Sequence, residues 1–275
     1  MIRLKTLLHG AAMGITELVP GVSSSTIAML MGIYEKLLAA ISDLTTGNWK
    51  RGLSFLIPLG IGMVASVLLF VSIIRYLLGE HNQPMMFLFM GLVLGILPFL
   101  WRSAHAETNR PFRPIHFIII AAAFILVATT SFFGESGQEV MTDLTIGSYV
   151  YLFISGWIAS TALVLPGISG SLMFMILGVY YTAIAAVDDF NFPVIITIGL
   201  GVLVGLLITS RIVRYLLRAY TQATYSAMIG LVAGSLIVIF PGTFPTTFLY
   251  TLVCVMTFIF GLSTALTFGK AERSQ

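Results

Sequence analysis

Two short segments rich in glycine and serine carry the residue types best suited to chemistry. Residues 20–26 read Pro-Gly-Val-Ser-Ser-Ser-Thr, and residues 166–171 read Pro-Gly-Ile-Ser-Gly-Ser. Each Pro-Gly pair breaks a helix, because proline has no backbone N–H, and the residues after it are expected to begin a new one. A helix start offers free N–H groups and a partial positive charge. Serine hydroxyls add donors, so these segments, here called tip one and tip two, suit an anion such as phosphate.

The tip residues that we expect to bind an anion share a backbone or hydroxyl donor. They are Gly21, Ser23, Ser24, Ser25 and Thr26 in tip one, and Gly167, Ser169, Gly170 and Ser171 in tip two. The alternative is that the hydroxyls only cap helices and satisfy freed backbone groups.

The tips belong to a longer internal repeat. Pro20, Gly32 and Tyr34 recur 146 positions later as Pro166, Gly178 and Tyr180. A second block recurs at an offset of 139, in which Arg75 matches Arg214; a longer loop at residues 45–51 accounts for the difference. The sequence therefore predicts two copies of one unit, residues 1–133 and 148–268, within a single transmembrane domain that spans residues 1–275.

Three ionisable residues complete the candidate site. Arginine binds phosphate through two parallel hydrogen bonds, so Arg75 and Arg214 are candidate ligands; the alternatives are an interfacial side chain for Arg75 and a simple anchor for Arg214. Glu17 lies three residues before Pro20 in an apolar segment, and the second unit has Leu163 in its place. A carboxylate at membrane depth usually serves function. We expect Glu17 to take part in proton or ion coupling; the alternatives are a pair with an arginine or contact with trapped water.

Composition places these residues in a membrane. Of the 275 residues, 58% are hydrophobic and 9% are charged, whereas soluble domains carry about 25% charged residues. The mean hydropathy is +1.01. No soluble fold of this length hides so much apolar surface, so lipid is the expected solvent.

The expected fold is all-α and polytopic, with two inverted-topology repeats. The segments around each tip are too short and too polar for full spans, which favours a re-entrant helical hairpin with limbs 4–19 and 27–41, repeated at 150–165 and 172–187. A pair of full helices joined by a loop is the alternative. Three spans follow each hairpin: 52–78, 84–101 and 115–133, then 193–217, 222–240 and 246–268. Because three crossings leave the chain on the opposite side of the membrane, the second hairpin should enter from the face opposite the first. Glycine-rich stretches at 60–62, 91–95 and 199–205 predict close helix packing.

Charge placement supports the same topology. If both termini lie in the cytoplasm, all of the 14 basic residues except Arg75 fall on the cytoplasmic side. This is the distribution that the positive-inside rule predicts. We expect a multi-pass protein of the bacterial plasma membrane with the loop at 135–143 outside.

The doubled Pro-Gly-Val/Ile-Ser tip, each followed by Gly-x-Tyr (Gly32 to Tyr34 and Gly178 to Tyr180), resembles the polyprenyl-phosphate transporter (PopT) family. The resemblance implies that undecaprenyl phosphate is moved from the outer to the inner leaflet and recycled for cell-wall polymers. In the family, tip one usually has glycines after its first serine, whereas Ser24 and Ser25 stand here.

A weaker likeness points to an enzyme. Residues 16–24 are similar to the Thr-Glu-x-x-Pro…Ser-Ser segment of undecaprenyl-pyrophosphate phosphatases. Met13 and Gly170 stand where those enzymes look to need a second glutamate and an arginine, and phosphoryl transfer requires groups that position and stabilise the charge. We therefore expect a transporter rather than an enzyme, with no cofactor or metal and no nucleic-acid partner; its partners are a polyprenyl phosphate and membrane lipids. A small-anion transporter is a further alternative, and the residues alone do not give the direction of transport or the oligomeric state.

Overall fold

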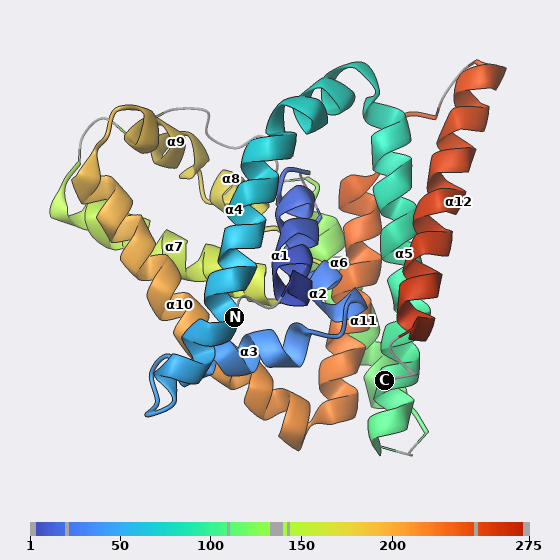
Figure 1. The fold of residues 1–275 in the computed structure, drawn as a ribbon, viewed down its shortest axis with the longest axis horizontal. Helices are drawn as coiled ribbons and strands as arrows, with labels where there is room; N and C mark the ends of the chain where they lie inside the picture. The colour runs from blue at the N-terminus through green and yellow to red at the C-terminus, as the bar shows by residue number, and fades with distance from the viewer. Residues whose placement is uncertain are drawn as a thin grey trace.

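The computed structural model describes residues 4–19, 22–108, 111–132, 140–141, 144–244 and 247–271, and all its regular elements are α-helices (Figure 1). The predicted all-α class is confirmed for these ranges. The helices are α1 (Leu4–Glu17), α2 (Ser24–Leu30), α3 (Tyr34–Asp43), α4 (Trp49–Glu80), α5 (Asn82–Thr108), α6 (Pro114–Thr130), α7 (Ile146–Val164), α8 (Gly170–Ile176), α9 (Tyr180–Asp188), α10 (Phe192–Ala219), α11 (Thr221–Ile239) and α12 (Phe248–Ala271).

Six of the described helices are long and apolar enough to cross a membrane: α4, α5, α7, α10, α11 and α12. The molecule is therefore a multi-pass membrane protein. Each of the six predicted spans corresponds to a helix, although α6, with 17 residues, is shorter than a typical span of about 20. Helix α7 departs from expectation, because its 19 residues reach spanning length where a short hairpin limb was predicted.

The segment after each tip is bent. Helices α2 and α3 meet at 118°, and α8 and α9 meet at 108°. The bends occur at Gly32 and Gly178, whose φ angles of 58° and 65° end each short helix in the left-handed conformation that glycine adopts readily. The interpretation of 27–41 and 172–187 as single return limbs is therefore wrong, because the Gly-x-Tyr motif turns the chain sharply.

In each half, the helix before the tip packs on the first long helix after the bent segment. Helix α1 packs on α4, and α7 packs on α10. A Cβ atom added at Gly62 would overlap the carbonyl oxygen of Leu7, and one added at Gly201 would overlap that of Phe153. These pairs confirm the predicted close packing. The prediction is wrong for Gly60 and Gly199, which face open space.

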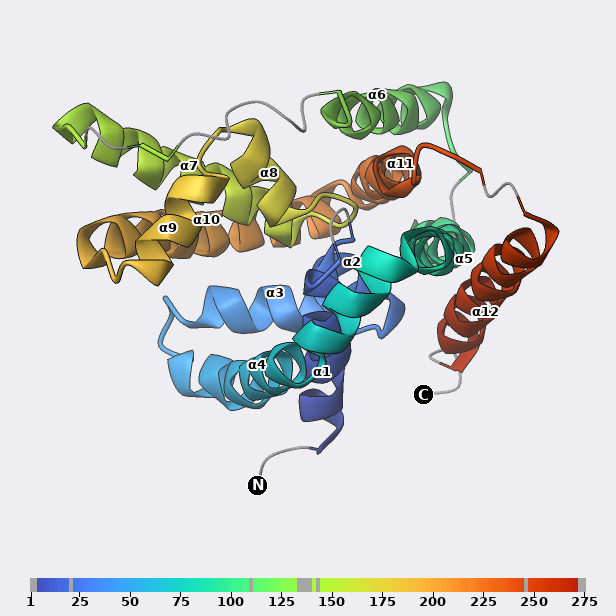
Figure 2. The same cartoon turned by 90° about the horizontal axis from the view of Figure 1, so that it is seen from above.

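The last helix of each half of the chain packs on a helix of the other half. Helix α6 packs on α11 and α12 packs on α5, while α5 and α11 contact each other (Figure 2). Glycines mark both contacts, Gly91 against the backbone of Phe258 and Gly230 against that of Ile120. Each half thus completes the packing of the other.

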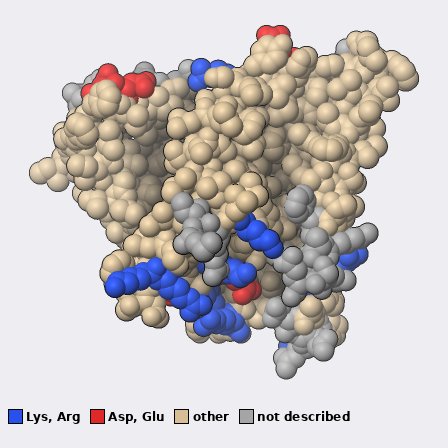
Figure 3. All heavy atoms as spheres, viewed as in Figure 1, with Lys and Arg blue, Asp and Glu red and all other residues tan. Residues whose placement is uncertain are grey.

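Charged side chains gather at two opposite edges of the molecule. Basic atoms lie mainly along the lower edge and acidic atoms mainly along the upper edge, with an apolar band between them (Figure 3). Helix α4 rises from the lower to the upper side, and α10 descends from the upper to the lower side (Figure 1). Arg75, near the end of α4, and Arg214, near the end of α10, therefore lie toward opposite edges.

Candidate functional site

Tip one is buried, and its hydroxyls contact one another. Ser23 occupies the N-cap position of α2 in an extended conformation without a side-chain capping hydrogen bond, and its Oγ lies 2.6 Å from the Oγ of Ser25. Ser24 and Thr26 are also buried. Pro20 and Gly21 lie outside the described residues, so the predicted role of Gly21 stays a prediction.

Tip two has the same local geometry. Ser169 occupies the N-cap position of α8, again without a side-chain capping hydrogen bond, with φ and ψ angles of −91° and 131° against −99° and 130° at Ser23. The Oγ atoms of Ser169 and Ser171 are 2.8 Å apart, as in the Ser23–Ser25 pair. Gly170 is the first residue of α8 and is buried. Since α2 and α8 have seven residues each, their dipoles are smaller than the predicted longer half-helices would have, and the hydroxyls and N–H groups are the main donors.

The structure brings the two tips together. The N–H of Gly167 donates to Oγ1 of Thr26 over 2.9 Å, although 141 positions separate them. Gly167, with a φ of 88°, also lies against the backbone of Leu231 in α11. The N–H of Gly167 is therefore engaged in holding the tips together and is not free for a ligand in this conformation.

A second hydrogen bond joins the same two regions. The hydroxyl of Tyr34 donates to the carbonyl of Val164 over 3.0 Å, and both groups are buried. The Gly-x-Tyr motif places this tyrosine at the start of α3, directly after the bend. The sequence indicated Tyr34 only as part of the repeat and Thr26 only as an anion-binding residue, so neither contact between the two regions was predicted.

Glu17 lies beside tip one. Its carboxylate contacts the hydroxyl and the backbone N–H of Ser24. Its Oε1 atom is buried without a hydrogen-bond partner among the described residues. An unpaired buried polar atom is costly, so this oxygen is suited to hold a proton, an ion or a polar group that enters the site.

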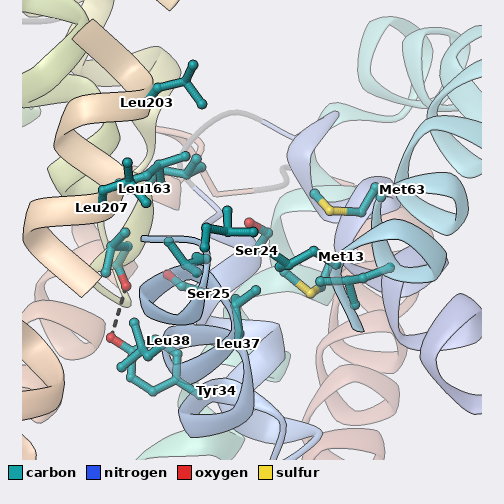
Figure 4. A pocket seen from close by; sticks show the side chains of 17 residues that line it. Met13, Ser24, Ser25, Tyr34, Leu37, Leu38, Met63, Leu163, Leu203 and Leu207 are labelled. Atoms are coloured by element: carbon teal, nitrogen blue, oxygen red, sulfur yellow. Dashed lines mark hydrogen bonds between the residues drawn. The ribbon is translucent and has the colours of Figure 1, made fainter. Parts of the chain in front are cut away.

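Tip one also borders a cavity of about 270 Å³ between α3, α4, α7 and α10. Ser24 and Ser25 lie at its centre in Figure 4, with Met13 and Met63 on one side and Leu163, Leu203 and Leu207 on the other. Its lining is otherwise almost entirely leucine, isoleucine and methionine, apart from Tyr34. Figure 3 shows the surface hollowed between α4 and α10.

Tip two borders a different cavity. Ser171 lines a space of about 300 Å³ together with Asn82, Thr130 and Ser131. Asn82 begins α5 and Phe240 ends α11, so this cavity lies toward the upper, acidic edge in Figure 1. The two cavities share no lining residue.

The arginines do not line either cavity at the tips. Arg214 lines a separate polar cavity of about 520 Å³ with Lys36, Arg218 and Glu35. Arg75 is exposed on α4. The structure thus joins the two tips through Thr26 and Gly167, places Glu17 beside tip one, and leaves the two arginines toward the edges.

A comparison with protein families shows to which family this chain is related. The family described as undecaprenyl phosphate translocase-like matches residues 13–253. The chain belongs to this family. Two curated relatives carry the name polyprenyl-phosphate transporter. The one from Staphylococcus aureus (strain NCTC 8325 / PS 47) is 37% identical over 270 residues, which are 96% of this chain and 95% of the relative. The one from Vibrio cholerae serotype O1 is 33% identical over 252 residues, covering 86% and 78%. No solved structure matches the chain.

Membership in the undecaprenyl phosphate translocase-like family confirms the resemblance drawn from the doubled tip motif. The names of the relatives favour a transporter over the phosphatase alternative. Within the described residues, no group of three or more histidine, cysteine, aspartate or glutamate side chains is arranged to hold a metal ion.

Proposed function

We propose that this protein transports a polyprenyl phosphate, undecaprenyl phosphate in particular, across the bacterial plasma membrane. The names of two relatives that share most of the chain supply the lipid class. The hydrogen bond from Gly167 to Thr26 is the observation that carries the proposal, because it joins two buried hydroxyl-rich tips from distant parts of the chain. A phosphate headgroup needs such a polar path, whereas its apolar tail can stay in lipid.

The phosphate is bound by hydroxyls from both tips. A doubly charged group in a low-dielectric interior needs several donors. The Ser23–Ser25 and Ser169–Ser171 pairs each satisfy only part of their hydrogen-bonding capacity within the pair. A headgroup that enters can accept from Ser23, Ser24 and Ser25 on one side and from Ser169 and Ser171 on the other. Separation of Thr26 from Gly167 would release the glycine N–H as a further donor.

Access alternates between the two faces. Two inverted repeats with re-entrant hairpins explain why the paired contacts α1–α4 and α7–α10 recur, and why α6 and α12 are exchanged. Tip two borders the cavity toward the acidic edge, and tip one borders the apolar cavity. With both termini in the cytoplasm, the acidic edge is outside, and the lipid moves from the outer to the inner leaflet for reuse in cell-wall synthesis.

The arginines serve entry and release rather than the central site. Arg75 attracts the headgroup at the outer surface. Arg214, with Lys36 and Arg218 around the polar cavity, receives it on the cytoplasmic side. Glu17, in contact with Ser24, takes up or releases a proton or ion as the phosphate passes.

The test uses purified protein in liposomes that contain a labelled short-chain polyprenyl phosphate. We expect the protein to speed movement of the label between leaflets, measured with a quencher that cannot cross the bilayer. The paired substitution Ser23→Ala with Ser169→Ala should abolish this movement. Ser263→Ala, which removes an exposed hydroxyl from α12, is the matched control.

Two outcomes would overturn the proposal. Release of phosphate from a polyprenyl pyrophosphate without lipid movement would favour the phosphatase alternative. Movement of inorganic phosphate alone would favour a small-anion transporter.

A further inference from the structure

The cavity beside tip one is lined by two serines and otherwise almost entirely by apolar side chains, which suits an amphiphilic ligand. Ser24 and Ser25 lie at its centre (Figure 4), and the side chains of α3, α4 and α10 around them are almost all hydrocarbon. Leu203, which lines the cavity, is 55% exposed on α10, so the cavity reaches the lipid-facing surface. A ligand that fits carries one polar end and a continuous apolar chain.

We infer that this cavity binds the isoprenoid segment next to the phosphate and so selects lipids by their tails. The inference rests on the proposed function, because tip one must hold the headgroup for the tail to lie here. The groove is continuous with the headgroup site through Ser24 and Ser25. Its occupant is thus the same lipid molecule and not a second ligand.

The size of the cavity limits how much of the tail it holds. Its volume of about 270 Å³ lies just below the range of about 300–1,000 Å³ for typical small-ligand pockets. Only the first isoprene units fit, and the remainder of a long chain stays in the bilayer. Affinity should therefore rise with chain length over the first few units and then level off.

The selectivity arises from packing rather than from the hydrophobic effect. A tail that leaves lipid for this cavity exchanges one apolar environment for another. What it gains is van der Waals contact with fixed side chains such as Leu38, Leu59 and Leu206. A branched isoprenoid chain fills such a shape differently from a straight acyl chain, which gives a physical basis for discrimination against ordinary phospholipids.

Gly60 offers a way to block the cavity without disturbing the backbone. It lines the cavity, and a Cβ atom added there meets no atom within 4 Å. A tryptophan at this position projects into space that the tail would use. Gly199, its counterpart in the second unit, is equally open but does not line the cavity. Both lie inside long helices, where replacement of glycine carries no loss of helix propensity.

The experiment measures binding of dimethylallyl, geranyl and farnesyl phosphate to the full-length protein in nanodiscs. For the unchanged protein we expect affinity to rise with chain length. Gly60→Trp should weaken the binding of farnesyl phosphate about tenfold and leave the affinity for dimethylallyl phosphate nearly unchanged. Gly199→Trp should behave as the unchanged protein. If Gly60→Trp does not fold, Leu203→Trp replaces it, with the exposed Val64→Trp as its control.

The outcomes separate this inference from the proposed function. Failure of the unchanged protein to bind any of the three phosphates would overturn the proposed function. Binding that increases with chain length equally in Gly60→Trp and Gly199→Trp would overturn the tail site alone. Equal affinity for farnesyl phosphate and a straight-chain alkyl phosphate of matched length would overturn the selectivity.

Discussion

The two tips share nearly the same backbone conformation but differ in the side chains at and beside them. Each begins a seven-residue helix behind a serine cap, and each cap serine pairs with the serine two residues on. Each helix then ends at a glycine with positive φ. Tip one adds Thr26 and the neighbouring Glu17, where tip two has Leu172 and Leu163.

This difference separates the frame that both tips share from the residues that make them unequal. The shared residues build a turn, a helix start and a bend, and they include the paired serines that we propose to bind phosphate from either tip. The unshared residues sit at the contact between the tips, where Thr26 accepts from Gly167 and Glu17 contacts Ser24. A symmetric pair of tips would work identically from both faces, so the asymmetric residues are the natural source of direction and coupling.

The largest effect is expected at Gly167. Its φ of 88° disfavours other residues, and a Cβ atom would lie 2.5 Å from the backbone of Leu231. Gly167→Ala should lower stability by roughly 3 kcal/mol or more, seen as a fall in the temperature at which the purified protein loses its monodisperse profile. Gly199→Ala, in open space, should be neutral or slightly stabilising. Equal stability of both variants would show that tip two is not fixed against α11.

Loss of the link between the tips should have the next largest effect. Thr26→Val keeps the shape and removes the acceptor for the N–H of Gly167, which costs about 1–3 kcal/mol for an unsatisfied buried group. Thr26→Ser retains the oxygen and should restore most of the stability. Leu172→Val, at the equivalent position of tip two, removes no hydrogen bond and serves as the control. Thermal stability and transport rate are measured together, and a Thr26→Val protein equal to Thr26→Ser in both would contradict a role for this contact.

Glu17→Gln should slow transport several-fold while the protein folds normally. The amide preserves the contact geometry with Ser24 but cannot take up a proton in the working pH range. We expect the transport rate of this variant to lose the pH dependence of the unchanged protein. Normal rates across the whole pH range would leave Glu17 as a structural partner of tip one and remove it from coupling.

The arginines should show the smallest effects, and they should differ by side. Arg75→Ala is expected to weaken capture from the outer leaflet, whereas Arg214→Ala should slow delivery to the inner leaflet. Both act through long-range attraction, which added salt reduces. Arg211→Ala is the matched control for Arg214, because Arg211 bonds to Thr45 and does not line the polar cavity. Transport measured in both directions at low and high salt would reveal no asymmetry if the arginines were only interfacial anchors.

Much of the architecture could be predicted because it depends on local rules. A Pro-Gly pair ends a helix wherever it occurs, and apolar runs of sufficient length become helices in lipid because backbone groups have no other partner there. The repeated Pro-Gly-Val/Ile-Ser motif likewise predicted two equivalent tips. The bend after α2 was missed because the Gly-x-Tyr motif was used to find the repeat and not as a helix stop, although Gly32 is the usual residue for that role.

The contacts between helices could not be predicted in the same way. Gly60 and Gly62 look alike in sequence, yet only Gly62 meets a neighbouring helix. Nothing in the residues of α6 specifies that it packs on α11 rather than on α5, since α5 and α11 both carry glycines at helix contacts. Helix packing in lipid depends on shape over the whole contact, and such shape exists only once the helices are assembled.

The sequence by itself therefore determined the helical class, the repeated unit, the candidate tips and the distribution of charge, because each follows from short segments and their preference for lipid or water. The tertiary structure alone decided that Thr26 meets Gly167 and that α6 packs on α11 while α12 packs on α5. It alone decided that an apolar cavity extends from Ser24 and Ser25 to Leu203. These features join residues far apart in the chain, and their free energy comes from contacts that no single segment contains.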